Sequence, residues 1–220
     1  MPATVTGVLN DDQLREFAEQ GYVLLPGAVP RDVVEAATAT VDELVEGEPP
    51  GDGVRGPHFY FPEAADEPSL IAPLTGTGAW EAAESLSGAG TLEEPWQVQV
   101  PLNIPPFLHL PGIPHIDGFP PLPDGRPATF TMLGGVLLSD QLDEDAGNLW
   151  IWPGSHLTHA AYFREKGPDA FFDAAGYPPL RLPERPVQLR GRAGDLLLAH
   201  YLLGHNIGGN TSGAVRRALY

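Results

Sequence analysis

The stretch AGDLLLAHYLLGHNIGGNTSGAVRRALY, residues 193–220, gives the clearest indication of the fold. Its apolar and aromatic runs predict three short strands, Asp195 to Tyr201, Gly204 to Ile207 and Arg216 to Tyr220. Each run is bounded by Gly, Asn or Ser residues, which favour turns. Short strands that follow one another so closely are typical of a sandwiched or closed β core.

Similar strand patterns extend toward the N-terminus. The predicted strands are Tyr22 to Leu25, Trp96 to Ile104, Thr129 to Ser139, Asn148 to Trp152 and Pro186 to Arg190. We therefore expect a mainly β protein with flanking helices, whose core is a double-stranded β-helix of the jelly-roll or cupin-like type. Residues 1–220 are expected to form one domain, in which a helical part, about 1–90, packs on a β core, about 94–220.

Three segments before residue 94 show helical periodicity. The first has Asn10 or Asp11 as its cap and ends at Gly21, a residue suited to a helix C-terminus. The second begins at Pro30, and apolar residues then recur at helical spacing as far as Val45. Residues 67–90 are expected to form one or two further short helices.

Composition and charge exclude several classes of partner. Twelve Lys and Arg against 29 Asp and Glu give a formal net charge of −17. Such a chain repels nucleic acid and anionic membrane surfaces, so neither is expected as a partner. The N-terminus has no basic region followed by an apolar one, and no apolar run is long enough to cross a membrane. We expect a cytoplasmic monomer or homodimer that acts on a small molecule.

The absence of cysteine leaves His, Asp and Glu as the ligands for any metal. His115 and Asp117 in PHIDG are two residues apart, so on an extended backbone their side chains share one face. The pair is also compatible with a surface turn before Gly118, in which Asp117 bonds to the backbone. His205, on a predicted strand, completes a facial triad of two histidines and a carboxylate, the ligand set of non-haem Fe(II) oxygenases.

Five segments, in order along nearly the whole chain, resemble the phytanoyl-CoA dioxygenase-like (PhyH) family of Fe(II)/2-oxoglutarate-dependent oxygenases. They are LREFAEQGYVLLPGAV, PHIDG, GNLWIWPGSH, AGDLLLAH and the closing pattern H-x4-N-x-S-x3-R, formed by His205, Asn210, Ser212 and Arg216. The resemblance implies Fe(II), 2-oxoglutarate and O2 as cofactor and co-substrates. It also implies that His115, Asp117 and His205 bind the iron and that Arg216 pairs with the distal carboxylate of 2-oxoglutarate.

An isolated arginine at position 216 would favour a solvated charge at a strand end, whereas the surrounding pattern favours co-substrate binding. Strand alternation predicts that Arg217 points the opposite way. The next co-substrate candidates are Ser212 and a polar strand face with Gln99 first, followed by Gln97 and Asn103, although this face also suits contact with solvent. Thr129 and Thr131 share a face and are further candidates. The aromatic residues expected to line the substrate pocket, with core packing as their alternative, are Phe59, Tyr60, Phe61, Phe119, Trp150 and Trp152.

The remaining histidines are expected to be structural. His156 follows Ser155, which we predict to cap a helix, and the same structural assignment applies to His58, His109, His159 and His200.

The resemblance implies a hydroxylase that acts on an unactivated C–H bond of a small metabolite or natural-product intermediate, with desaturation or cyclisation as other outcomes. Asp117 is a carboxylate, where related halogenases have a small residue. Two alternatives are a non-catalytic jelly-roll metal-binding protein and a cupin-like enzyme that does not use 2-oxoglutarate. Departures from the family are Ile207, where a small hydroxyl residue is usual, and an end at Tyr220, which implies a longer natural chain or a missing tail.

Overall fold

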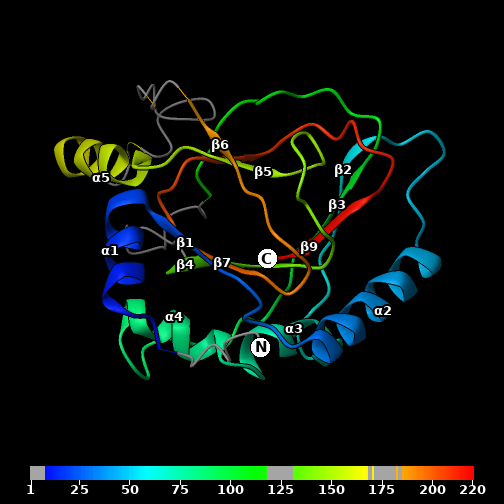
Figure 1. Ribbon diagram of the computed structural model, residues 1–220, viewed down its shortest axis with the longest axis horizontal. Helices are drawn as coiled ribbons and strands as arrows, with labels where there is room; N and C mark the ends of the chain where they lie inside the picture. The colour runs from blue at the N-terminus through cyan, green and yellow to red at the C-terminus, as the bar shows by residue number, and fades with distance from the viewer. Residues whose placement is uncertain (1–7, 118–130, 168–169, 171–181, 183–184) are drawn as a thin grey trace.

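The computed structural model describes residues 8–117, 131–167, 170, 182 and 185–220 (Figure 1). The helices are α1 (Asp11–Gln20), α2 (Arg31–Gly47), α3 (Pro68–Thr75), α4 (Ala79–Ser87) and α5 (Ser155–Lys166). The strands are β1 (Tyr22–Leu25), β2 (Gly56–Tyr60), β3 (Val100–Ile104), β4 (Met132–Leu137), β5 (Leu149–Ile151), β6 (Val187–Gln188), β7 (Leu196–His200), β8 (His205–Ile207) and β9 (Arg216–Leu219).

Two antiparallel sheets form the centre of the molecule. The large sheet has six strands in the order β1-β7-β4-β9-β3-β2, and the small sheet has three in the order β6-β5-β8. Neighbouring strands in both sheets come from distant parts of the sequence, as in a jelly roll. The predicted fold class, a β core of jelly-roll type with flanking helices, is confirmed.

Each face of the large sheet has its own apolar core. The outer face packs with α2, α3 and α4, and Val41, Leu70 and Ala82 from these helices are buried against it. The inner face meets the small sheet, where Ile151 and Leu197 are buried together. Figure 1 shows the three helices below the large sheet and β5 and β6 above it. The space between the sheets is therefore the only part of this sandwich in which residues of both sheets can converge on a ligand.

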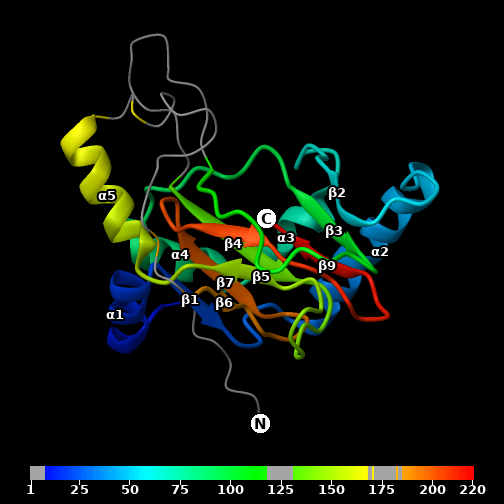
Figure 2. The same ribbon diagram turned by 90° about the horizontal axis from the view of Figure 1, so that it is seen from above.

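The local sequence signals at the first helix are confirmed. The Asn10 side chain accepts hydrogen bonds from the backbone N–H groups of Asp12 and Gln13. The Gln13 side chain in turn accepts one from the Asn10 backbone N–H, which completes a capping box. Gly21 ends the helix in the left-handed region, with φ +84°, and a side chain there would collide with the His156 ring. Figure 2 shows α1 and α5 at the same end of the molecule, with α2 at the other.

Two expectations about local structure were wrong. No strand was expected between residues 47 and 94, yet β2 forms one edge of the large sheet, while the predicted strand β1 forms the other. Ser155 does not cap α5: Gly154 holds the cap position, and the Ser155 hydroxyl instead accepts a hydrogen bond from the Gly204 backbone at 2.8 Å. The serine therefore connects α5 to the segment that leads into β8.

No helix among the described residues is long and apolar enough to cross a bilayer.

Candidate metal centre

Backbone pairing places His115 beside His205. His115 lies in the segment that follows β3, and its N–H and C=O exchange hydrogen bonds of 2.9 Å each with those of His205 at the start of β8. Opposite residues of this kind have side chains on the same face. Asp117, two residues further along the same segment, completes the group.

The three side chains lie close enough to hold one ion. His115 Nε2 is 3.4 Å from one carboxylate oxygen of Asp117, and His205 Nε2 is 3.3 Å from the other. One ligand atom from each residue lies within 4.8 Å of the other two. Asp117 is partly exposed whereas His205 is buried, so one side of the group is open and the other is closed by protein.

Burial and mutual contacts shift the pKa values of all three side chains. Burial lowers the pKa of His115 to about 4, with a further contribution from His205. Burial is the largest single influence on the pKa of His205 and lowers it, but the hydrogen bond to Asp117, the charge of Asp117 and the contact with Leu203 together outweigh burial and raise the pKa. The pKa of Asp117 is lowered, because contacts with both histidines outweigh its burial. The electrostatics of the group therefore favour a cation between His205 and Asp117, as in a metal site.

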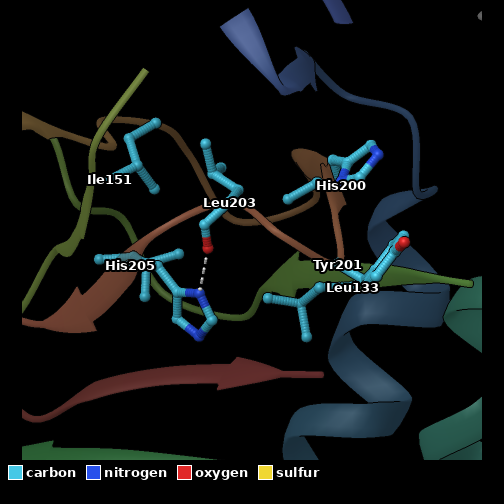
Figure 3. A pocket seen from close by; sticks show the side chains of 8 residues that line it. Leu133, Ile151, His200, Tyr201, Leu203 and His205 are labelled. Atoms are coloured by element: carbon cyan, nitrogen blue, oxygen red, sulfur yellow. Dashed lines mark hydrogen bonds between the residues drawn. The ribbon is translucent and has the colours of Figure 1, made fainter. Parts of the chain in front are cut away.

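The donor set fits a divalent transition metal. Two imidazole nitrogens and a carboxylate oxygen are the ligands of mononuclear non-haem iron sites. One ring nitrogen of His205, Nε2, lies 3.3 Å from Asp117 Oδ2. The other ring nitrogen, Nδ1, lies 2.9 Å from the carbonyl oxygen of Leu203 (Figure 3). Such a hydrogen bond is the usual means of orienting a metal-binding histidine.

A small apolar hollow lies beside His205 and has no room for a water molecule. Its walls are mainly aliphatic, with Leu133 and Ile151 on opposite sides and Leu203 above the histidine (Figure 3). His200 and Tyr201 close its far end. An apolar wall beside a polar group excludes water and strengthens the electrostatic interactions of that group.

Arg216 is buried between the sheets and has no acidic partner in the described part of the chain. Only 2% of its surface is exposed, yet its Nη1 atom has no hydrogen-bond partner among the described residues. It lies opposite Asn103 on β3, whose amide donates to the carbonyl of Gly208, just after β8. A buried cation that lacks a counter-ion indicates a place for an anionic ligand. Arg217 points the opposite way, as predicted, and pairs with Asp42 of α2 at 2.6 Å.

The other predicted co-substrate residues occupy varied positions. Gln99 is half-buried, and its backbone exchanges hydrogen bonds with that of Tyr220. Ser212 is exposed in the turn before β9, where its hydroxyl contacts Asn210 at 2.7 Å. Thr131 is exposed just before β4, and Thr129 lies outside the described residues.

Two of the predicted pocket residues point away from the metal-binding side chains. Tyr60 faces the outer core and donates its hydroxyl to the carbonyl of Glu48 at 2.6 Å. Trp150 lies opposite Asn206, whereas Ile151 lies opposite His205, so the indole is on the other face of the small sheet.

Of the other predicted pocket residues, Phe59, Phe61 and Trp152 are described and Phe119 is not. Phe59 is opposite Pro101, on the sheet face that includes Arg216, and its ring stacks on that of Phe61. Trp152 is buried, and Phe119 lies outside the described residues.

Two residues that contact Arg216 were absent from the sequence prediction. Gln141 accepts a hydrogen bond from Arg216 Nε at 3.2 Å, and the Tyr220 hydroxyl accepts one from Nη2 at 2.7 Å. No motif marks Gln141, which lies in a loop after β4. Strand alternation was the available signal for Tyr220, since it shares a face with Arg216 on the last predicted strand.

Comparison with protein families gives one match. Residues 115–218 match the family model described as phytanoyl-CoA dioxygenase (PhyH). This range begins at the first metal-binding candidate and includes Arg216. No curated protein sequence matches the chain.

Solved structures with the same fold cover almost the whole chain. The carbocyclase SnoK from nogalamycin biosynthesis, described as non-haem and α-ketoglutarate-dependent, is 23% identical with a TM-score of 0.67, over 96% of this chain and 82% of SnoK. AviO1 from Streptomyces viridochromogenes Tue57 is 19% identical with a TM-score of 0.64, over 96% and 93%.

HygX from Streptomyces hygroscopicus, solved with nickel and 2-oxoglutarate, is 18% identical with a TM-score of 0.62, over 96% of this chain and 85% of HygX. These likenesses concern the fold, and the family match adds the sequence pattern of the β core. Residues 115–218, which include all three metal-binding candidates and Arg216, therefore have the sequence pattern of the phytanoyl-CoA dioxygenase (PhyH) family.

Proposed function

We propose that this protein is a non-haem Fe(II)/2-oxoglutarate-dependent dioxygenase with a small-molecule substrate. The observation that supports the proposal most strongly is the buried guanidinium of Arg216, which has no acidic partner among the described residues and lies in the same sandwich as the group His115, Asp117 and His205. A metal-binding protein without 2-oxoglutarate would have no use for this cation, and burying it unpaired costs free energy.

His115, Asp117 and His205 would hold the iron, and Arg216 would bind the distal carboxylate of 2-oxoglutarate through a charge-assisted hydrogen bond. When bound, the iron supplies the position at which 2-oxoglutarate is oxidatively decarboxylated with O2 to succinate and CO2. The His205 contact with Leu203 keeps the ring oriented for this role, and the aliphatic walls formed by Leu133 and Ile151 exclude water.

Hydroxylation of an unactivated C–H bond is the outcome that we propose, because Asp117 retains a carboxylate at the metal. Relatives of the same fold include a carbocyclase, SnoK, and an epimerase, SnoN, so ring closure and epimerisation are the competing outcomes. Product analysis by mass spectrometry separates them, since hydroxylation adds one oxygen atom whereas the other two do not.

The substrate that we propose is a small neutral or cationic metabolite, such as a natural-product intermediate. The net charge of −17 disfavours a phosphate-rich thioester. HygX has been solved with hygromycin B and SnoN with nogalamycin RO, which shows that this fold accommodates natural products. We further propose a single cytoplasmic domain over residues 1–220, as a monomer or homodimer.

Anaerobic titration tests the proposal. Addition of Fe(II) and 2-oxoglutarate to the apoprotein should produce the visible charge-transfer band of the metal-bound keto acid. Arg216→Met should lose this band at moderate 2-oxoglutarate concentration. Arg217→Met should retain it, because the neighbouring side chain faces α2 and contacts Asp42 instead of the site. Failure of folded wild-type protein to give the band, or equal bands in both variants, would refute the proposal.

A further inference from the structure

The two protein groups that contact the Arg216 guanidinium are both uncharged. Nε donates to the amide oxygen of Gln141, and Nη2 donates to the hydroxyl oxygen of Tyr220, whereas Nη1 has no partner within the described ranges. Arginine in protein interiors is usually neutralised by a carboxylate. Two neutral contacts orient the planar guanidinium from two sides and leave its charge available.

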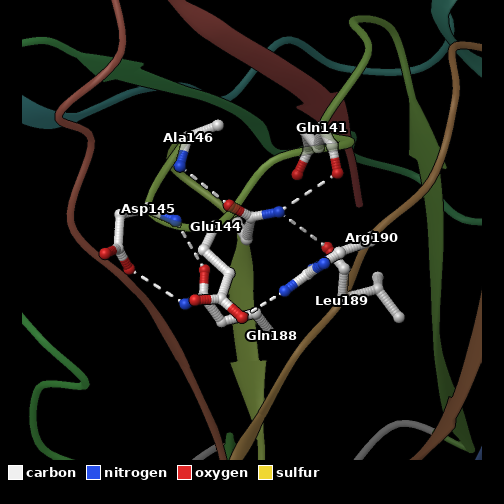
Figure 4. Close-up of polar contacts among 8 residues, drawn as sticks. Gln141, Glu144, Asp145, Ala146, Gln188, Leu189 and Arg190 are labelled. Atoms are coloured by element: carbon white, nitrogen blue, oxygen red, sulfur yellow. Dashed lines mark hydrogen bonds and ion pairs between the residues drawn. The ribbon is translucent and has the colours of Figure 1, made fainter.

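Gln141 is itself fixed by a buried hydrogen-bond network. Its backbone pairs with that of Gly191, and its carbonyl oxygen accepts from the Asn148 amide at 3.2 Å. The same Asn148 amide donates to the Leu189 carbonyl at 3.0 Å, while its oxygen accepts from the Ala146 backbone (Figure 4). Gln141 has no exposed surface, so its amide oxygen is held where Arg216 Nε meets it.

A second unmatched donor lies in the same cluster. Gln141 Nε2, like Arg216 Nη1, is buried and has no hydrogen-bond partner among the described residues. Buried N–H groups are almost always paired in folded proteins. One unmatched donor on the guanidinium and a second on the neighbouring amide suit an acceptor with negative charge, and a carboxylate offers two oxygens for this purpose.

Tyr220 is held by close packing and by its backbone. The backbone N–H and C=O of Tyr220 exchange hydrogen bonds with those of Gln99 at 2.9 and 2.8 Å. Its ring lies against Gly135 of β4, where an added Cβ would be 2.4 Å from the ring edge. A tyrosine oxygen that accepts from Arg216 still has its own hydrogen to donate. The hydroxyl can therefore contact the same ligand oxygen as the guanidinium.

We propose that Gln141 and Tyr220 are positioning residues that form a neutral clamp on Arg216 and reserve its charge for a carboxylate ligand. This inference rests on the proposed function, in which the ligand is 2-oxoglutarate. The affinity of the site for 2-oxoglutarate then depends on Arg216 and also on the absence of charge on Gln141 and Tyr220. A carboxylate at position 141 would compete with the ligand for the guanidinium.

Gln141→Glu tests the clamp because it keeps the shape of the side chain and adds the charge. The glutamate should pair with Arg216 Nε, so the apoprotein should melt at the wild-type temperature or above it, since a buried cation gains a counter-ion. The dissociation constant of 2-oxoglutarate should rise by roughly 10- to 100-fold. Gln20→Glu is the matched control: it adds the same charge at the exposed C-terminal end of α1, so it should leave the dissociation constant unchanged and lower the melting temperature only slightly.

The measurements are thermal unfolding of the metal-free protein and anaerobic calorimetric titration of 2-oxoglutarate in the presence of Ni(II). Weakened binding with retained or raised melting temperature supports the clamp. Unchanged binding in Gln141→Glu would overturn it, and weakened binding with a lowered melting temperature would do so too, since Gln141 would then have a structural role only. Absence of binding to the wild type would refute the proposed function itself.

Tyr220→Phe tests the second side of the clamp. Removal of the hydroxyl leaves Arg216 Nη2 without its partner and should raise the dissociation constant of 2-oxoglutarate by roughly 3- to 10-fold. Tyr162→Phe on α5 is the control and should bind as the wild type does. Equal affinity of Tyr220→Phe and wild type would remove Tyr220 from the clamp.

Discussion

Gly147 provides a sharp test of how closely the Arg216 site is packed. The residue has φ +82°, and an added Cβ would lie 2.8 Å from Arg216 Cβ and 3.2 Å from Asn103 Cβ. Gly147→Ala therefore combines backbone strain with a collision against two buried side chains. Strain in the left-handed region costs about 1–2 kcal/mol, and overpacking of a buried site costs about 1–3 kcal/mol. The free energy of unfolding should fall by about 2–5 kcal/mol.

Gly53→Ala is the matched control for the strain alone. Gly53 has φ +79°, close to that of Gly147, but nothing lies within 4 Å of an added Cβ. This variant should lose only the strain energy, about 1–2 kcal/mol. Urea denaturation of both variants at one pH gives the two differences, and an unchanged m value would show that the unfolded states are comparable.

Gly147→Ala should also weaken 2-oxoglutarate binding, because the collision displaces Arg216 at its Cβ. Gly53→Ala should bind the ligand as the wild type does. The reasoning is refuted if the two variants lose equal stability, or if Gly147→Ala retains full affinity. Either result would mean that the Arg216 backbone moves without cost to accommodate the methyl group.

Three further predictions concern other parts of the molecule. Asn10→Ala removes the capping box of α1 and should lower the free energy of unfolding by about 1 kcal/mol in urea denaturation, and no loss would contradict the capping role. Asp42→Ala breaks the partly exposed ion pair with Arg217 and should cost less than about 1 kcal/mol by the same assay, so a larger loss would contradict a weak surface pair. Burial lowers the pKa of His200 to about 4, so the unfolded chain binds a proton at higher pH than the folded protein does. The stability that neutral His200 contributes is complete above pH 6.5 and is lost as the pH falls toward 4. His200→Gln should therefore lose less free energy of unfolding between pH 7 and 5 than the wild type does. Equal losses in the two proteins would disprove this prediction.

Local features of the sequence were sufficient to predict most of the helices and strands of this protein. The capping residue Asn10, the terminating Gly21 and the alternation of residues in β3, β7 and β9 are short-range signals, and each depends on neighbours along the chain. Spacing alone also placed His115 and Asp117 on one face and separated Arg216 from Arg217. The edge strand β2 was missed, since its Gly-Pro beginning is typical of a loop.

The partners of the buried groups were decided only by the tertiary structure. Pairing of His115 with His205, and of Asn103 with Arg216, depends on the order in which distant strands meet. No pattern around Gln141 indicates that its amide contacts Arg216. The aromatic residues show the same limit, because Phe59 and Tyr60 are adjacent in sequence but face opposite sides of the large sheet. Sequence period gives the alternation of side chains, whereas the packing of the second sheet decides which face becomes a site.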